Sequence, residues 1–179
     1  MKKIPVVLFM FLTTTVIAQN KDYLLSTDGI GPIKLGMPLT ALEELLQKKI
    51  TLKVINIDSV VLVETIKTKY KSIDLVIDLV KWQDETIVLN GITSSSSLCK
   101  TKSGIGIGST RLQIITAFDG YYIDATPQYK MVGDKFLKSK TENTITVKDD
   151  EEGNAIVFNL VNNKVVSFKI YPIYDDEEG

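Results

Sequence analysis

Few residues in this sequence could carry out catalysis. The 179 residues include no histidine and a single cysteine. Ser-His-Asp and Cys-His catalysis are therefore not expected, nor are most zinc and copper sites, which use imidazole ligands. Cys99 could act as a nucleophile only beside another activating group, and free cysteines are often buried like small apolar residues. The sequence predicts a structural Cys99, no catalytic residue and no metal site.

Carboxylate pairs are the other route to catalysis, and Asp74 and Asp78 are the best placed. They alternate with apolar residues in the segment 73–79, the pattern of a strand with one buried face. Four residues along a strand span about 13 Å. That exceeds the roughly 6.5–9.5 Å between the carboxylates of an inverting glycosidase. We interpret both as solvent-facing acids, and a hydrolase with a cross-strand carboxylate pair stays an alternative.

Glycine-rich and acidic segments could bind a cofactor or an ion, but their spacing is wrong. Residues 104–108 read Gly-Ile-Gly-Ile-Gly, which lacks the G-x-G-x-x-G spacing and the βαβ context of a dinucleotide loop. The acidic runs 149–154 and 175–179 lack the alternating ligands of an EF-hand calcium loop. We predict no cofactor, and we interpret the two runs as a solvated hairpin turn and a frayed acidic tail.

The first 18 residues have the pattern of a secretory signal peptide. Lys2 and Lys3 form a positive n-region, an apolar stretch follows through Ile17, and Ala18 offers a small residue before the cleavage site. Polar residues follow at once, whereas a transmembrane anchor, the alternative, needs about 20 predominantly apolar residues. No cysteine stands there for lipid attachment. We expect a periplasmic or secreted protein with no membrane anchor after cleavage.

Charge and composition narrow the partners of the remaining 161 residues (179 minus 18). The full chain has 21 basic and 22 acidic residues, and loss of Lys2 and Lys3 leaves 19 and 22, a net charge of −3. Nucleic-acid binding depends on clustered basic residues, so no nucleic acid is expected as a partner. Since one cysteine forms no internal disulfide, stability must come from a core, for which an apolar content of 44% is sufficient.

Two stretches of the chain share a pattern at an offset of 72 residues, the distance between Gly36 and Gly108. Each glycine ends an Ile-x-apolar-Gly sequence and precedes apolar residues at helical spacing. After each helical segment the period changes to about 2, which is typical of strands. We predict a duplication, with repeat 1 at residues 19–97 and repeat 2 at residues 98–179.

The predicted fold class is α+β, with two tandem repeats. Each repeat is expected to be a helical segment packed on a three-stranded antiparallel β-meander. The predicted strands are the runs 60–66, 73–79, 86–93, 144–148, 155–161 and 164–171. Because a small isolated sheet is marginal unless a helix covers it, the two units should pack side by side.

The segments 33–39 and 101–110, with the order helix then three strands, resemble tandem repeats of the β-lactamase-inhibitory-protein-like type. The same unit, used once, is similar to the small outer-membrane assembly lipoproteins of the SmpA/OmlA type. This chain departs from both, because Cys99 alone cannot form the inhibitors' disulfides and no cysteine replaces the lipoproteins' acylated one. The resemblance implies an extracytoplasmic protein-interaction module whose sheet offers a binding face, and it implies no particular partner.

The outward face of the predicted sheet is the best candidate binding surface. If the apolar residues of the segment 73–79 face the helices, Asp74, Asp78 and Trp82 lie on the opposite side. The same alternation exposes Lys169 and Tyr171 in the last strand. Aromatic residues dominate binding hot spots, although Trp82 could instead complete a hairpin end or a second small core. We predict that these five residues bind a partner.

These observations favour an exported, non-enzymatic protein-interaction module, an inhibitor or an envelope assembly factor, whose partner is another extracytoplasmic protein. The alternative is a periplasmic small-ligand-binding protein with a pocket between the repeats, or the hydrolase already considered. An apolar cavity lined by converging polar groups would favour the alternative. An aromatic-rich sheet face without a pocket would favour the interaction module.

Overall fold

The computed structural model describes residues 20–52, 63–82 and 85–174. The predicted signal peptide (residues 1–18) and acidic tail (residues 175–179) lie outside the described residues. In the part of the chain that is described, no helix is long and apolar enough to cross a membrane.

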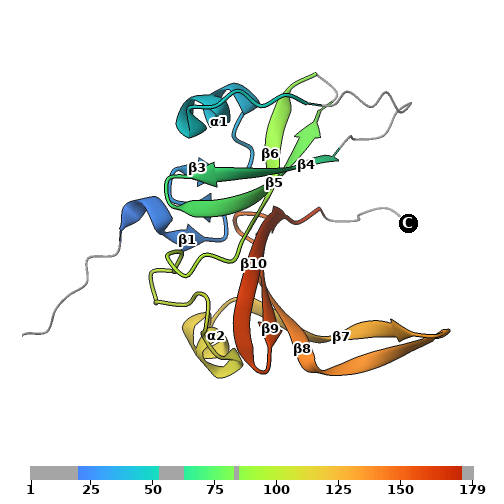
Figure 1. Cartoon of the computed structure of the whole chain (residues 1–179). Coiled ribbons are helices and arrows are strands. Elements are labelled where there is room, and N and C mark those ends of the chain that lie inside the picture. The colour runs from blue at the N-terminus through green and yellow to red at the C-terminus, as the bar shows by residue number, and fades with distance from the viewer. Residues whose placement is uncertain (1–19, 53–62, 83–84, 175–179) are drawn as a thin grey trace, which may run out of the picture.

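Seven strands form one antiparallel sheet, the main element of the fold (Figure 1). In order across the sheet they are β4 (Val63–Tyr70), β5 (Ile73–Lys81), β6 (Ile87–Ser94), β10 (Lys164–Pro172), β9 (Asn154–Val161), β8 (Lys135–Asp149) and β7 (Tyr122–Val132). Strands β4 to β6 and β7 to β10 are two meanders, which join where β6 pairs with β10. This junction has a short register, from Phe168 opposite Ser94 to Ile170 opposite Ile92.

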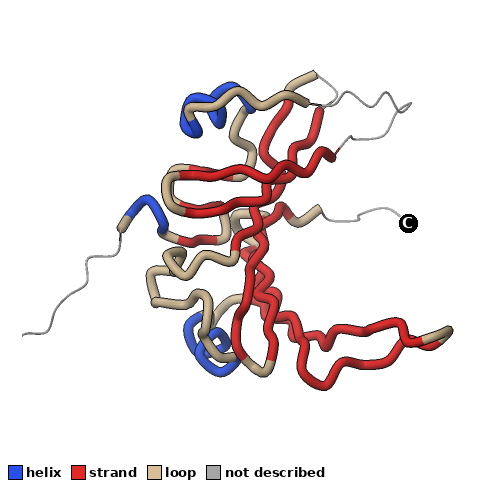
Figure 2. The backbone as a smooth tube through the Cα atoms, in the orientation of Figure 1, coloured by secondary structure: helices blue, strands red, loops and turns tan. Residues whose placement is uncertain are grey.

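A smaller sheet and short helices complete the described fold. The small sheet contains β1 (Leu25–Ser26), β2 (Gly29–Ile30) and β3 (Ile33–Lys34), and the helices are the 3-10 turn η1 (Lys21–Tyr23), α1 (Leu39–Leu46) and α2 (Arg111–Ala117). Figure 2 shows how small the helical share of the chain is. Thr110 begins α2 with a capping box. Its side chain accepts from the backbone N–H of Gln113, and the Gln113 side chain accepts from the backbone N–H of Thr110.

The hydrophobic core lies between the large sheet and the two helices. The alternating apolar residues of the segment 73–79 are buried, as their period of two predicts. They belong to the same core as Leu42 of α1, Ile114 of α2 and Phe168 of β10. Both helices therefore pack on one face of the large sheet, which we call the inner face. The opposite face is called the outer face.

The two helices begin in the same way. Gly36 (φ 74°) precedes α1 and Gly108 (φ 86°) precedes α2, and both adopt the left-handed conformation that favours glycine. The N–H of Gly36 donates to the carbonyl of Leu89 in β6 at 2.8 Å, and that of Gly108 donates to the carbonyl of Val165 in β10 at 2.9 Å. The predicted duplication requires such matched turns, and it stays a prediction.

The predicted fold class, two helix-plus-meander units of α+β type, is wrong. The structure is mostly β, with 55% in strands, and its two described α-helices have only eight and seven residues. The meanders do not form two sheets side by side, because β6 and β10 join them into one. A continuous sheet brings apolar residues of β4, β5, β6, β8, β9 and β10 into a single buried core, and Ile123 of β7 packs against it. The second meander also has a fourth strand, β7, that was not expected.

Candidate functional site

The outer face of the large sheet carries the predicted partner-binding residues of β5 and β10. One cross-strand row on this face runs through Lys67, Val76, Thr93, Lys169, Val157, Thr146 and Asp124. Since opposed residues share a face and neighbours alternate, Asp74, Asp78 and Tyr171 lie on the same face as Lys169. Seven strands at a spacing of about 4.8 Å make this face about 29 Å wide.

Asp78 is held at the centre of the outer face by two partners. Its Oδ1 accepts from the hydroxyl of Thr65 at 2.7 Å, and its Oδ2 forms an ion pair with Nζ of Lys169 at 2.7 Å. The Asp78 side chain is only 13% exposed, so the prediction of a solvent-facing acid is wrong for Asp78. A charged group can be buried to this extent when it is paired and hydrogen-bonded. The contacts link β4, β5 and β10 across the junction of the two meanders. Asp78 and Lys169 thus satisfy each other within the chain.

Gly91 makes room for this carboxylate. It lies opposite Asp78 in β6, and a Cβ at this position would lie 2.8 Å from Oδ2 of Asp78. Side-chain atoms do not approach that closely, so any larger residue would displace the carboxylate. Glycine in a strand interior often marks such a close approach.

Asp74 lies apart from this pair, at the edge of a depression. Its carboxylate forms an ion pair with Lys69 at 2.7 Å, with both side chains mostly exposed. The depression has a volume of about 340 Å³, and its outer-face lining includes Lys67, Asp74, Val76, Thr93, Ser95 and Ser167. Small hydroxyl-bearing side chains leave this space above the middle of the sheet.

The two predicted aromatic contacts are separated from the depression. Tyr171 is half-buried and pairs with Ala155 of β9. Trp82 follows the last residue of β5, and its N–H donates to the carbonyl of Thr86 at 2.9 Å in the turn to β6. Trp82 is 50% exposed, and it lies about 26 Å along the strand from Asp74. The predicted partial exposure of both rings is confirmed, but they do not form one cluster with Asp74.

Cys99 is fully buried in the core, which confirms the prediction that it packs as a small apolar residue. Burial raises the pKa of the Cys99 thiol to about 11, against a lowering effect of a hydrogen bond with Ser96. At neutral pH the thiol is therefore protonated, and a thiol is a far weaker nucleophile than a thiolate.

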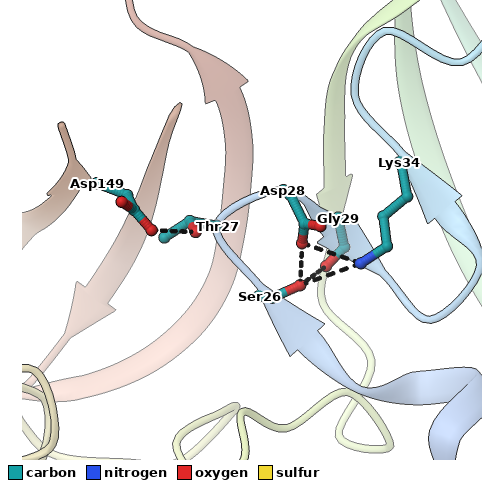
Figure 3. Close-up of polar contacts among 6 residues, drawn as sticks. All are labelled: Ser26, Thr27, Asp28, Gly29, Lys34 and Asp149. Carbon is teal, nitrogen blue, oxygen red and sulfur yellow. Dashed lines mark hydrogen bonds and ion pairs between the residues drawn. The ribbon is translucent and has the colours of Figure 1, made fainter. Parts of the chain in front are cut away.

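A polar cluster that the sequence did not indicate lies at the β1–β2 turn (Figure 3). Asp28 accepts from the hydroxyl of Ser26 and forms an ion pair with Lys34 at 2.9 Å. Burial opposes ionisation, but these hydrogen bonds and the Lys34 charge hold the pKa of Asp28 below its ordinary value. Thr27 donates to Asp149 at the end of β8 at 2.9 Å. The Thr27–Asp149 hydrogen bond connects the small sheet to the large one, whereas the charges of Asp28 and Lys34 pair with each other.

The end of the β7–β8 hairpin is a second exposed surface, and sequence reasoning missed it. Strand β8 pairs with β9 only from Glu142 onward, so residues 128–142, here called the hairpin tip, project from the body (Figure 1). Its large apolar side chains are all at least half exposed: Tyr129, Met131, Val132, Phe136 and Leu137. The Gly133-Asp134 pair between residues rich in Tyr, Val and Phe is a hairpin signal that could have predicted it.

No family model, curated protein or solved structure matches this chain. The resemblance to inhibitory-protein-like repeats and to assembly lipoproteins therefore stays a prediction made from the sequence.

Proposed function

We propose that this protein is an exported, non-enzymatic binding module that holds another extracytoplasmic protein on the outer face of its large sheet. The observation that carries the proposal is the extent of that face. Both described helices pack on the inner face, and the outer face spans about 29 Å across the strands, although its surface along β5 is interrupted by the buried Val80 between Asp78 and Trp82.

The distribution of the predicted contact residues also favours a protein over a small ligand. Asp74 and Asp78, the latter paired with Lys169 of β10, lie along β5 and Trp82 follows its end, so these residues do not surround one cavity. Asp78 is already held by Thr65 and Lys169, so its role on this face is to set the position of the lysine. A non-enzymatic role is supported by the absence of histidine from the sequence and by the protonated, buried Cys99.

Binding of a small polar ligand is the second candidate, and one observation favours it. The depression of about 340 Å³ lies within the roughly 300–1,000 Å³ of small-molecule sites. Its hydroxyl groups and the charges of Lys67 and Asp74 could orient a polar molecule. Such sites are mostly apolar with a few convergent polar groups; the depression shares that character but is only partly enclosed, so it would cover less of a bound molecule than such sites do.

Affinity capture with matched baits tests the proposal. The full-length chain is expressed with export, and the recovered protein is immobilised and exposed to an extract of the same compartment. In Thr93→Arg a long side chain fills the depression on the outer face. Thr116→Arg makes the same change on an exposed position of α2. We expect a protein that the unchanged bait and Thr116→Arg retain and that Thr93→Arg retains at least tenfold less, the loss expected when a central contact is blocked.

Equal retention of every protein by the three baits would contradict the proposal for this face. Thermal unfolding of each bait confirms that the substitutions leave the fold intact. Native mass spectrometry of the recovered protein tests the second candidate, which predicts a bound small molecule that Thr93→Arg lacks.

A further inference from the structure

The hairpin tip exposes apolar side chains on both of its faces. Opposed residues in this ribbon are Met131 with Phe136 and Tyr129 with Lys138, and these rungs alternate with Lys130–Leu137 and Val132–Lys135. Because opposed residues share a face and rungs alternate, Tyr129, Met131 and Phe136 lie on one face. Val132 and Leu137 lie on the other. A rigid, flat partner could cover only one of these faces.

The free edge of β7 is poorly suited to pairing with another strand. Pro127 lies within β7 and has no N–H to donate, which is a common protection of edge strands. The register of the hairpin also shifts between Pro127 and Tyr129, so the edge is not a continuous ladder. The tip is thus expected to bind through its side chains rather than as an added strand.

Positive charge is concentrated at the hairpin tip. The tip holds four lysines, Asp134 and Glu142, out of 21 basic and 22 acidic residues in the chain. The rest of the chain therefore has 17 basic and 20 acidic residues, a net charge of −3, against +2 at the tip. Lys130 is paired with Glu142 at 2.6 Å. In the described part of the chain Lys135, Lys138 and Lys140 form no salt bridge.

We propose that the hairpin tip inserts into the headgroup region of a lipid bilayer that carries anionic lipids. A fluid interface can surround both faces of a ribbon, which a flat protein surface cannot. Interfacial segments bury their apolar side chains about 5–10 Å deep. This depth corresponds to the first three rungs, or cross-strand pairs, counted from the turn, at about 3.3 Å each. These rungs contain Met131, Val132, Phe136 and Leu137, together with Lys130 and Lys135. Lysine side chains extend their charged ends to the headgroups while their hydrocarbon stems stay in the apolar region. Tyr129 lies at the level of the interface.

The uneven distribution of charge orients the molecule with its hairpin tip toward an anionic bilayer. The lysines of the tip are attracted to anionic headgroups, whereas the net negative remainder of the molecule is repelled. Asp134 in the turn opposes insertion, so Asp134→Asn should strengthen binding to an anionic bilayer. The inference does not depend on the outer face of the sheet, and it requires only peripheral contact, without a span or an anchor.

Vesicle flotation tests the proposal. The full-length chain is expressed with export, and the recovered protein is mixed with vesicles of phosphatidylcholine and phosphatidylglycerol or of phosphatidylcholine alone. We expect binding to the mixed vesicles that weakens as salt is raised. Met131→Ser/Phe136→Ser should bind at least tenfold more weakly. Lys138→Gln/Lys140→Gln should lose about 30-fold at low salt, since each lysine near an anionic surface contributes about fivefold.

Two matched controls separate the tip from the rest of the surface. Leu112 of α2 is 72% exposed, and Leu112→Ser removes an equally exposed apolar group elsewhere. Lys48→Gln/Lys102→Gln removes two exposed lysines away from the tip. Both controls should bind like the unchanged protein. A retained leader segment would bind vesicles equally in every variant, so the differences between variants report on the tip alone.

Fluorescence gives an independent measurement. In Trp82→Phe/Phe136→Trp the only indole is at the tip, and its emission should shift to shorter wavelengths with the mixed vesicles. The proposal is overturned if the unchanged protein does not bind mixed vesicles, if Met131→Ser/Phe136→Ser binds as well as the unchanged protein, or if the indole at position 136 stays in water. An acidic protein cross-linked to the tip, with no vesicle binding, would assign the surface to a protein partner instead.

Discussion

The middle of the large sheet and the hairpin tip are both built from antiparallel strands, yet charged and apolar side chains are paired and covered in the first and exposed in the second. On the outer face, Asp78 is almost enclosed and its charge is matched by Lys169. At the tip, Lys138 and Lys140 have no salt-bridge partner among the described residues, and Phe136 is 70% exposed. The charge of Asp78 on the outer face is thus paired within the described chain, whereas the two lysines and the apolar side chains of the hairpin tip face solvent.

The number of neighbouring strands explains the difference. A central strand such as β5 has a neighbour on each side, and those neighbours supply partners such as Thr65 to its side chains. The last rungs of the β7–β8 hairpin have only each other. Their side chains can therefore be covered only by something outside the chain. This is why a contact surface of different chemistry is proposed for each region.

The largest expected effect comes from replacing a phenylalanine by alanine, once in the core of the sheet and once at the hairpin tip. Phe158 in β9 is fully buried and Phe136 is 70% exposed. Phe158→Ala should lower the free energy of unfolding by about 3–5 kcal/mol, because it leaves a core cavity. Phe136→Ala should change it by less than about 0.5 kcal/mol. Urea denaturation of both variants measures this, and a loss above about 2 kcal/mol for Phe136→Ala would mean that the tip packs on the body.

The two predicted acids of β5 provide the next comparison. Asp78→Ala should lower the free energy of unfolding by about 2 kcal/mol, since it removes hydrogen bonds to a nearly buried charge. Asp74→Ala should lower it by at most about 0.5 kcal/mol, because the Lys69–Asp74 pair is exposed. Denaturant titrations at neutral pH measure both. Similar losses for the two variants would mean that the pair across the junction contributes no more than a surface ion pair.

Cys99 gives a smaller effect with a defined pH dependence. Cys99→Ala should lower the free energy of unfolding by about 1 kcal/mol at pH 7. The folded-state pKa of about 11 lies above the ordinary value of 9.0. The unfolded thiol therefore ionises first, and the folded state loses stability relative to Cys99→Ala as pH rises from about 9 to 11. Stability curves for both proteins over this range check it. A difference independent of pH would contradict the raised pKa.

Local patterns in the sequence predicted the elements better than their assembly. Strand β5, both helices and the burial of Cys99 follow from periodicity and residue type over a few positions. The junction of β6 with β10 does not, since it pairs Ile92 with Ile170, and nothing local specifies a partner so far along the chain. Two separate small sheets were expected for that reason.

The candidate sites show the same limit. The outward direction of Asp78 and Lys169 follows from alternation, but their mutual pairing depends on the junction of the two meanders. Strand β7 was missed because Asp124 and Pro127 interrupt its apolar pattern, and both are unfavourable in strands. The turn at Gly133-Asp134 was the signal that could have located the hairpin tip.

The smallest expected effect on stability concerns Trp82, whose substitution also tests the proposed binding function. Because Trp82 is 50% exposed and follows the end of β5, Trp82→Ala should lower the free energy of unfolding by about 0.5 kcal/mol. A buried aromatic would lose about 3–5 kcal/mol. If the outer face is a protein interface, an aromatic at its end can contribute 2 kcal/mol or more to binding, about thirtyfold in affinity. Thermal unfolding and partner affinity are measured on the same sample. A large loss of stability with unchanged affinity would make Trp82 part of the core and confine any interface to the middle of the face.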